Sequence, residues 1–245
     1  MISLRRLLTE AARCVLAGPS LGSMWRRLAF APLRLWLTNP RRALLFVAVR
    51  PYTMLPYKRL AKLAELADEC NRLNIPGAFV QCGVWKGGSA AVLASLANGR
   101  RVELFDTFEG CPEPGPKDIS MYGRPGVAGE ALAGMQHILG LLDRLGLTDP
   151  RVRVHLGRIE TTARMAVDCI DTIALLHLDC DWYSGTRAAM ESLYLRVADG
   201  GYVFADDVGY WPAAQEAIEQ YFLMRGSYKP PQTWVDHTGA FWQKA

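Results

Sequence analysis

The chain has 245 residues, of which half are hydrophobic and 21% are charged, a balance that is typical of a globular protein and excludes general disorder. This length supports one sizeable hydrophobic core, or one core with a small appendage. The net charge of +4 conceals an asymmetry. Residues 1–50 contain nine arginines and one acid, Glu10, so the rest of the chain has a net charge of −4. An acidic body argues against nucleic acid as a substrate.

The cysteines and histidines show no metal-binding or disulfide pattern. The six cysteines are scattered without a C-x-x-C pair, and the four histidines have no zinc-ligand spacing. This usage favours reduced thiols in a cytoplasmic protein. No apolar run reaches the ~18 residues of a membrane span, and a signal peptide fits poorly because Glu10 and Arg13 interrupt the apolar stretch.

Residues 1–50 are predicted to be a basic helical extension, followed by a catalytic domain over residues 51–245. The sequence predicts helices over Leu4–Leu16, over Met24–Leu37 and from Pro40 onward. Two interpretations remain open. These helices cap the body or a subunit interface, or they form a basic, tryptophan-containing face that lies on an anionic membrane.

The next part of the chain begins with an amphipathic helix and continues into strand–helix alternation. A helix from near Pro56 buries a stripe that ends at Leu73. A buried strand, a glycine-rich turn and a helix are predicted over Ala78–Gly99, and a second strand over Arg101–Gly110. Residues 111–128 are rich in Pro and Gly and are predicted to form a mobile loop over the edge of the sheet where the strands have their carboxyl ends.

The C-terminal half repeats this alternation. Strands are predicted over Val152–Gly157, Ile173–Asp179 and Gly201–Asp207, with the helix between the last two carrying apolar residues as far as Val197 before a Gly-Gly stop. A helix over Pro212–Met224 and two strands around a turn at residues 237–239 complete the chain. The pattern predicts an α/β fold with a doubly wound, mainly parallel sheet and an antiparallel strand at its end.

Carboxylates end two strands that one crossover connects. Parallel strands share a rim, so Asp179, Asp206 and Asp207 should converge there, with Asp181 close by. An acid after a strand is commonly a helix cap, but three acids without a cationic residue among them would repel one another. A divalent cation would relieve that repulsion, so the sequence predicts a metal site.

The sequence "VQCGVWKGGSA" is neither a dinucleotide fingerprint nor a P-loop. The spacing of Gly83 and Gly87 after a strand lets the backbone approach a ligand, and Lys86 and Ser89 near the helix start are candidates to face a carboxylate. Alone, the motif is equally compatible with an ordinary turn. Its weight comes from Asp106 at the end of the next strand, where an acid accepts hydrogen bonds from ribose hydroxyls.

Together, "RPYTM", "IPGAFVQCGVWKGGSA", "FDTFEGCPEP", "LHLDCDWYSGT", "DGGYVFADD" and "WVDHTGAFW" resemble class I S-adenosylmethionine-dependent methyltransferases, and more narrowly the macrocin O-methyltransferase family. The resemblance runs from Arg50 to the end. It implies a seven-stranded Rossmann-like fold, S-adenosylmethionine as cofactor, a metal that is normally Mg²⁺, and methylation of a sugar hydroxyl on a glycan or glycosylated natural product. It also suggests a homo-oligomer.

The resemblance assigns roles to individual residues. The turn at Gly83 would contact the methionine part of the cofactor and Asp106 the ribose, while Asp179, Asp206 and Asp207 match the metal ligands. Asp179 is the first candidate for the general base and Asp181 the second. The cofactor-binding candidates are Thr53, Met54, Gln81, Gly83, Trp85, Gly87, Ser89, Asp106 and Thr107.

Two positions depart from the family pattern. Gln81 stands where the family usually has an acid, and His237 where an aromatic is common. Other functions stay open beside the glycan methyltransferase. They are an O-methyltransferase for catechols or other small diols, and a catalytically silent cofactor-binding scaffold. The glycine spacing disfavours a nicotinamide-dependent dehydrogenase.

Overall fold

The computed structural model describes residues 2–18 and 20–245 and has an α/β fold built on one seven-stranded sheet of order β3-β2-β1-β4-β5-β7-β6. The strands are β1 (Ala78–Cys82), β2 (Val102–Asp106), β3 (Val152–Leu156), β4 (Ile173–Leu178), β5 (Val197–Ala205), β6 (Thr233–Trp234) and β7 (Ala240–Gln243). Strands β1 to β5 pair in parallel, whereas β7 is antiparallel to both β5 and β6. The predicted fold class is confirmed.

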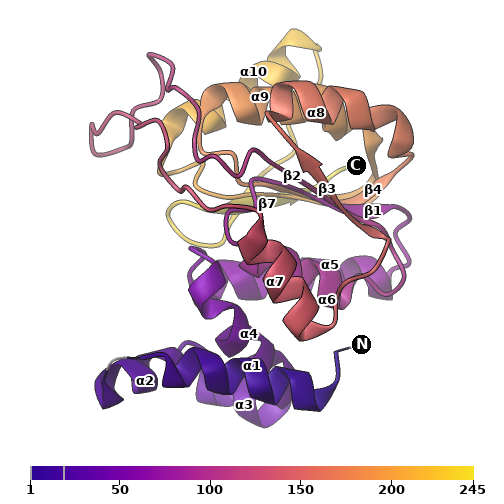
Figure 1. The fold of residues 1–245 in the computed structure, drawn as a ribbon. Helices are drawn as coiled ribbons and strands as arrows, with labels where there is room; N and C mark the ends of the chain where they lie inside the picture. The colour runs from indigo at the N-terminus through magenta and orange to yellow at the C-terminus, as the bar shows by residue number, and fades with distance from the viewer. Residues whose placement is uncertain (1, 19) are drawn as a thin grey trace.

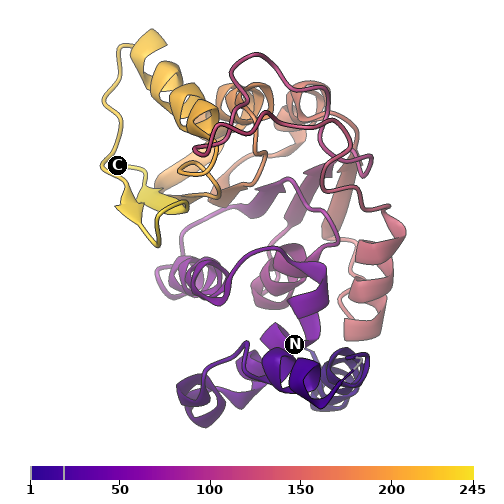
Figure 2. The same ribbon diagram turned by 90° about the vertical axis from the view of Figure 1, so that its left-hand side faces the viewer.

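Helices cover both faces of this sheet (Figure 1). They are α1 (Leu4–Leu16), α2 (Leu21–Leu28), α3 (Leu33–Thr38), α4 (Pro40–Val49), α5 (Tyr57–Arg72), α6 (Gly88–Leu96), α7 (Gln136–Leu145), α8 (Ile159–Ala166), α9 (Tyr183–Leu193) and α10 (Pro212–Met224). Helices α8, α9 and α10 lie on one face and α5, α6 and α7 on the other, with α1 to α4 forming a further layer beyond α5 to α7. The turned view in Figure 2 shows the same layers.

Two predicted helix boundaries are wrong. Helix α9 ends at Leu193, and β5 already begins at Val197, so no Gly-Gly stop ends the helix. Instead Gly200 has φ +76° within β5, where the register with β4 shifts, so a glycine serves as a strand irregularity. The predicted helix over residues 24–37 is two helices, because Pro32 lacks an N–H and disfavours helical backbone in the residue before it.

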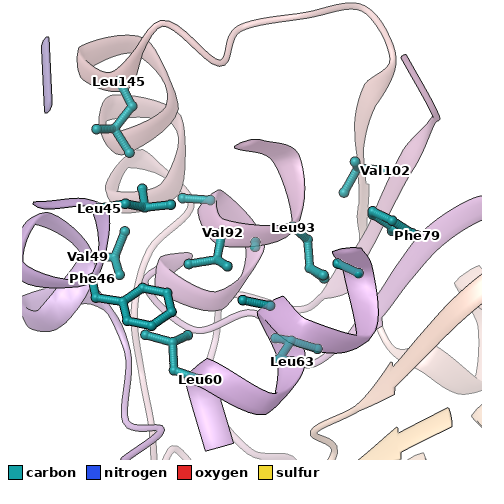
Figure 3. Close-up of a cluster of buried hydrophobic side chains, with 14 of the residues drawn as sticks. Leu45, Phe46, Val49, Leu60, Leu63, Phe79, Val92, Leu93, Val102 and Leu145 are labelled. Atoms are coloured by element: carbon teal, nitrogen blue, oxygen red, sulfur yellow. The ribbon is translucent and has the colours of Figure 1, made fainter. Parts of the chain in front are cut away.

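Helix α4 packs directly on the body of the protein (Figure 3). Leu45, Phe46 and Val49 of α4 lie in one hydrophobic cluster with Leu60 of α5 and Leu145 of α7. All five side chains are at most 5% exposed. The division of the chain at residue 50 is a change in charge rather than a break in this core, and the two-domain assignment stays a prediction.

A buried acid links the first helix to the body. Glu10 of α1 is 2% exposed and accepts a hydrogen bond from Arg144 Nε of α7 at 2.9 Å, with Arg13 3.6 Å away. Arg144 Nη2 donates in turn to the Tyr52 hydroxyl at 2.8 Å. Since Tyr52 ends the 3-10 turn Arg50–Tyr52 between α4 and α5, the chain of contacts Glu10–Arg144–Tyr52 ties the N-terminal layer to the segment that leads into the body.

Replacing Glu10 by alanine is expected to lower the free energy of unfolding by about 2 kcal/mol, because it leaves the Arg144 guanidinium without its buried carboxylate. Glu65→Ala is the matched control. Glu65 pairs with Lys62 in α5, but its side chain is 66% exposed, so its loss should cost under about 0.5 kcal/mol. Urea denaturation of the two variants measures the difference, and equal losses would contradict a structural role for Glu10.

Candidate active site

The carboxyl ends of β1, β2, β4 and β5 meet at one rim, because these four strands are parallel and adjacent in the sheet. A cavity of about 1090 Å³, including the part open to solvent, lies at this rim. Residues that follow all four strands line it, namely Gly83, Asp106, Asp179, Asp206 and Asp207. This is the place where open α/β sheets bind ligands.

Only glycine fits at position 83, because the end of the neighbouring strand β4 lies against it. It has φ +86°, and a Cβ atom there would lie 1.8 Å from the carbonyl oxygen of Asp179. The first glycine of the turn is therefore needed because the ends of β1 and β4 come into contact, in addition to any approach by a ligand. The glycine-rich turn at Gly83 and Asp179, the first candidate for the general base, therefore share one wall of the cavity.

Asp106 fixes the conformation of the same turn. Its Oδ2 accepts hydrogen bonds from the backbone N–H of Val84 at 2.6 Å and of Trp85 at 2.9 Å, and its Oδ1 accepts one from Phe108 at 2.6 Å. A carboxylate has about four lone-pair sites, so one further donor can be accommodated. Asp106 thus shapes the cavity wall and still offers an acceptor to it.

Gln81 lies behind this wall and has no part in the lining. Its Nε2 donates to the Gly83 carbonyl at 2.7 Å and to Ser89 Oγ at 2.8 Å. Because a carbonyl only accepts, the bond to Gly83 fixes which way the amide points. Its Oε1 is buried and has no hydrogen-bond partner among the residues that the structure describes.

Four carboxylates, those of Asp179, Asp181, Asp206 and Asp207, line the same cavity. Burial, followed by the neighbouring carboxylates of Asp206, Asp181 and Asp207, raises the pKa of Asp179 well above its usual range. Burial and then Asp207 raise the pKa of Asp181 to about 7. The four acids line one cavity and so converge as the strand connection predicted, and their proximity is what raises these pKa values.

The backbone around the cavity is strained. Trp85, Phe108, Asp181 and Asp207 all have positive φ, between 51° and 58°, and each follows the end of a different one of the four strands. Non-glycine residues rarely adopt this conformation, and such residues cluster where function fixes the backbone.

Arg59 contradicts the expectation that no cation lies among these acids. Its Nη1 donates to Asp206 Oδ1 and to Asp207 Oδ1, both at 2.7 Å, and its Nε donates to Asp236 Oδ2 at 3.0 Å. The side chain comes from the first turn of α5, and its charge keeps the carboxylates together. In the described residues no group of three or more His, Cys, Asp or Glu side chains is arranged to hold a metal ion.

His177 lies beneath this cluster in β4. It is fully buried, and burial together with the Arg59 charge lowers its pKa to about 3. Its ring packs at a tilt on Phe204, with the centroids 5.2 Å apart. A neutral, enclosed imidazole agrees with the structural role expected from its position in a buried strand.

Two loops complete the walls. The segment before α5 contributes Thr53, which is buried, and Met54, which is 59% exposed. The loop of residues 107–135 projects on the left in Figure 1 and contributes Cys111, whose thiol donates to Asp181 Oδ2 at 3.7 Å. This loop is attached to the body through buried Asp118, which accepts a hydrogen bond from Tyr183 N at the start of α9.

Most predicted site residues line the cavity. Besides the five residues named at the strand ends, they are Thr53, Met54, Trp85, Ser89, Thr107 and Asp181. Gly87 and Gln81 do not reach it, and Lys86 lies over the Trp85 ring instead. Gly87 has φ +91° at the start of α6 and packs against Ile138.

The sequence reasoning missed several lining residues. Arg59 gave no signal, because it is one basic residue among several in an amphipathic helix. Arg158, Ile159 and Glu160 directly follow the parallel strand β3, and the rule that ligands bind at carboxyl ends would have found them. The other missed residues include Cys111, Trp182, Ser184 and Gly185.

Comparison with known proteins shows that this chain is similar to O-methyltransferases. The sequence model of the Macrocin-O-methyltransferase (TylF) family matches residues 46–244. The 8-demethyl-8-(2,3-dimethoxy-alpha-L-rhamnosyl)-tetracenomycin-C 4'-O-methyltransferase of Streptomyces olivaceus is 32% identical over 205 residues, covering 78% of this chain and 75% of that protein. The demethyldecarbamoylnovobiocin O-methyltransferase of Streptomyces niveus is 28% identical over 209 residues, covering 79% and 76%.

Two solved methyltransferase structures are similar to this chain in fold. The O-methyltransferase NovP has a TM-score of 0.72 and 27% identity, with 79% of this chain and 82% of that chain covered. The calicheamicin methyltransferase CalS11 has a TM-score of 0.66 at 18% identity, covering 98% and 91%, and so shares the fold.

Proposed function

Because this chain belongs to the macrocin O-methyltransferase family, and so to the S-adenosylmethionine-dependent O-methyltransferases, we propose that it methylates a sugar hydroxyl of a glycan or glycosylated natural product. The observation that carries the proposal is the cavity at the rim of the sheet, which the glycine-rich turn and a cluster of carboxylates line together. The names of the relatives support the acceptor class, since the protein from Streptomyces olivaceus is named for a rhamnosyl substrate.

The cofactor is assigned to the side of the cavity formed by β1 and β2. Gly83, Trp85 and Ser89 would hold its methionine part. Gln81 lies behind them and would act on the cofactor indirectly, through its hydrogen bonds to Gly83 and Ser89. Asp106 would accept a hydrogen bond from a ribose hydroxyl with its remaining lone pair. Thr107, the next residue, also lines this part of the cavity. Thr53 and Met54 would close the cavity above the cofactor, and Gly87 contributes indirectly by starting α6.

The charge and chemistry of these carboxylates suit a divalent cation, although their side chains are not arranged around one and Arg59 lies among them. Asp179, Asp206 and Asp207 offer hard oxygen ligands, and four carboxylates face one guanidinium, so negative charge remains uncompensated. These three residues would hold Mg²⁺. When bound, Mg²⁺ would lower the pKa of an acceptor hydroxyl and help orient it.

The reaction needs a proton acceptor next to the hydroxyl. When bound, S-adenosylmethionine would supply the methyl group, which would pass to the hydroxyl oxygen as the S–CH₃ bond breaks and S-adenosylhomocysteine forms. Asp179 takes the proton, because it lies on the cavity wall in contact with the Gly83 turn. Asp181 is the second candidate, and the Cys111 thiol helps to hold its carboxylate in place.

Two alternatives use the same cavity. A catechol or another small diol would be methylated by the same chemistry, with only the acceptor contacts differing. A silent scaffold would bind the cofactor without turnover. Incubation with labelled S-adenosylmethionine separates the three functions. A rhamnosyl glycoside should accept label, catechol should not, and absence of label from every acceptor would favour the scaffold.

Calorimetric titration tests the proposed site. We expect wild type to bind S-adenosylmethionine and S-adenosylhomocysteine, and to show a Mg²⁺-binding event that EDTA abolishes. Asp206→Ala should lose the metal event and keep cofactor binding. Asp236→Ala is the matched control, since Asp236 also binds Arg59 but lies outside the cavity lining. Absence of cofactor binding to wild type would refute the assignment of the cavity, and absence of a metal event would refute the metal site.

Arg59 gives a further prediction for this site. Replacing Arg59 by methionine is expected to tighten Mg²⁺ binding at least tenfold, about 1.4 kcal/mol, because it removes the positive charge that occupies Asp206 and Asp207. Lys58→Met removes an exposed charge from the preceding residue of α5 and should leave affinity unchanged. Mg²⁺ titration without cofactor measures both. Weaker binding in the Arg59 variant would mean that the arginine organises the ligands rather than competing for them.

A further inference from the structure

The outer layer of the molecule carries apolar side chains that the core does not use. On α1, Leu7, Ala11 and Val15 are buried, whereas the side chains of Leu4 and Leu8, one helical turn apart, are 45% and 49% exposed. On α3, Leu33 and Leu37 are 73% and 77% exposed. Each of these helices therefore shows leucines to solvent at i, i+4 spacing, which places them on one side of the helix. We define the basic–apolar surface as the exposed residues Leu4, Arg5, Leu8, Leu16, Trp25, Arg26, Leu33, Arg34 and Leu37.

The charge on this surface has one sign. Among residues 1–50 the only acid is Glu10, and it is turned inward to Arg144. Arg5, Arg26 and Arg34 are exposed, and within the described part of the chain they form no ion pair with a carboxylate. Burial of Glu10 thus leaves the outside of the layer purely basic.

Size and sequence exclude a transmembrane role for this layer. Helices α1, α2 and α3 have 13, 8 and 6 residues. Among the helices that the structure describes, none combines the length and apolar character of a membrane span. Short helices that expose leucine, tryptophan and arginine are typical of segments that lie in the plane of a membrane interface.

We propose that the basic–apolar surface binds the face of an anionic lipid bilayer. The leucines and Trp25 would enter the boundary between headgroups and acyl chains, while the arginines bind lipid phosphates. The charge decides against a second copy of this chain as the occupant. A two-fold interface would place the three arginines of this surface, Arg5, Arg26 and Arg34, opposite a second set of the same arginines, and like charges would oppose the contact. The helices lie in a layer of their own on the far side of α5 to α7, so they can meet a flat surface without displacing the body (Figure 2).

Vesicle flotation tests the proposal on the full-length protein. We expect binding to vesicles of 30% phosphatidylglycerol in phosphatidylcholine, and at least tenfold weaker binding to pure phosphatidylcholine. Arg5→Gln/Arg26→Gln/Arg34→Gln and Trp25→Ser/Leu33→Ser/Leu37→Ser should each lose at least tenfold in affinity for the anionic vesicles. Raising the salt from about 0.05 M to about 0.5 M should release the wild type, because the Debye length falls several-fold.

The matched control removes the same charge elsewhere. Arg153→Gln/Arg164→Gln/Arg225→Gln changes three exposed arginines of the body and should bind like wild type. Cofactor titration of every variant shows that it remains folded. No binding of wild type to anionic vesicles, or equal binding by the two arginine variants, would overturn the proposal. So would a dimer in light scattering that the Trp25/Leu33/Leu37 variant converts to a monomer, because a second copy would then cover the surface.

Discussion

Asp179→Asn is expected to lower kcat by about 10²- to 10⁴-fold, because asparagine keeps the shape of the side chain but cannot take the proton of the acceptor hydroxyl. The fold should not suffer. Burial and three neighbouring carboxylates disfavour the charge of Asp179, so removing it should leave the free energy of unfolding unchanged or raise it. Steady-state kinetics and thermal unfolding measure the two effects together, and a variant that is stable but inactive is the expected outcome.

Asp199→Asn is the control for this variant. Asp199 is an exposed acid of β5 outside the cavity lining, so activity should stay at the wild-type level. Mg²⁺ titration separates the two roles of Asp179. If activity of Asp179→Asn recovers at high Mg²⁺, the carboxylate acts as a ligand; if it does not, it acts as the base. A kcat within threefold of wild type would exclude Asp179 and direct the same test to Asp181.

Gly83→Ala is expected to abolish cofactor binding and to lower the free energy of unfolding by at least about 3 kcal/mol. The new Cβ would lie 1.8 Å from the Asp179 carbonyl oxygen, a distance that no side-chain rearrangement relieves because the obstacle is backbone. The ends of β1 and β4 would have to separate, and the turn that we assign to the cofactor would move with them. Denaturant unfolding and cofactor titration measure the result.

Gly123→Ala separates this contact from backbone strain. Gly123 has φ +78°, close to the +86° of Gly83, but a Cβ atom there meets nothing within 4 Å. Its replacement should cost only the strain of the left-handed backbone, about 1 kcal/mol, and leave cofactor binding intact. Similar losses in the two variants would show that strain, rather than the contact with Asp179, makes Gly83 necessary.

The sequence by itself determined the sheet and its rim. Apolar runs at β1, β2 and β4, each followed by a glycine or an acid, were enough to predict parallel strands whose carboxyl ends meet, and the cavity lies there. These predictions succeeded because a buried parallel strand is read from a few consecutive residues, and because crossover handedness leaves few topologies.

Only the tertiary structure decided what stands between the carboxylates. Arg59 lies 147 residues before Asp206, and its charge reaches the rim because α5 packs beside β4 and β5. No periodicity or spacing records such an ion pair. The same holds for Glu10 and Arg144, which are 134 residues apart. Local patterns report how a segment buries its own apolar face, whereas the partner of a buried charge depends on which distant element packs against it.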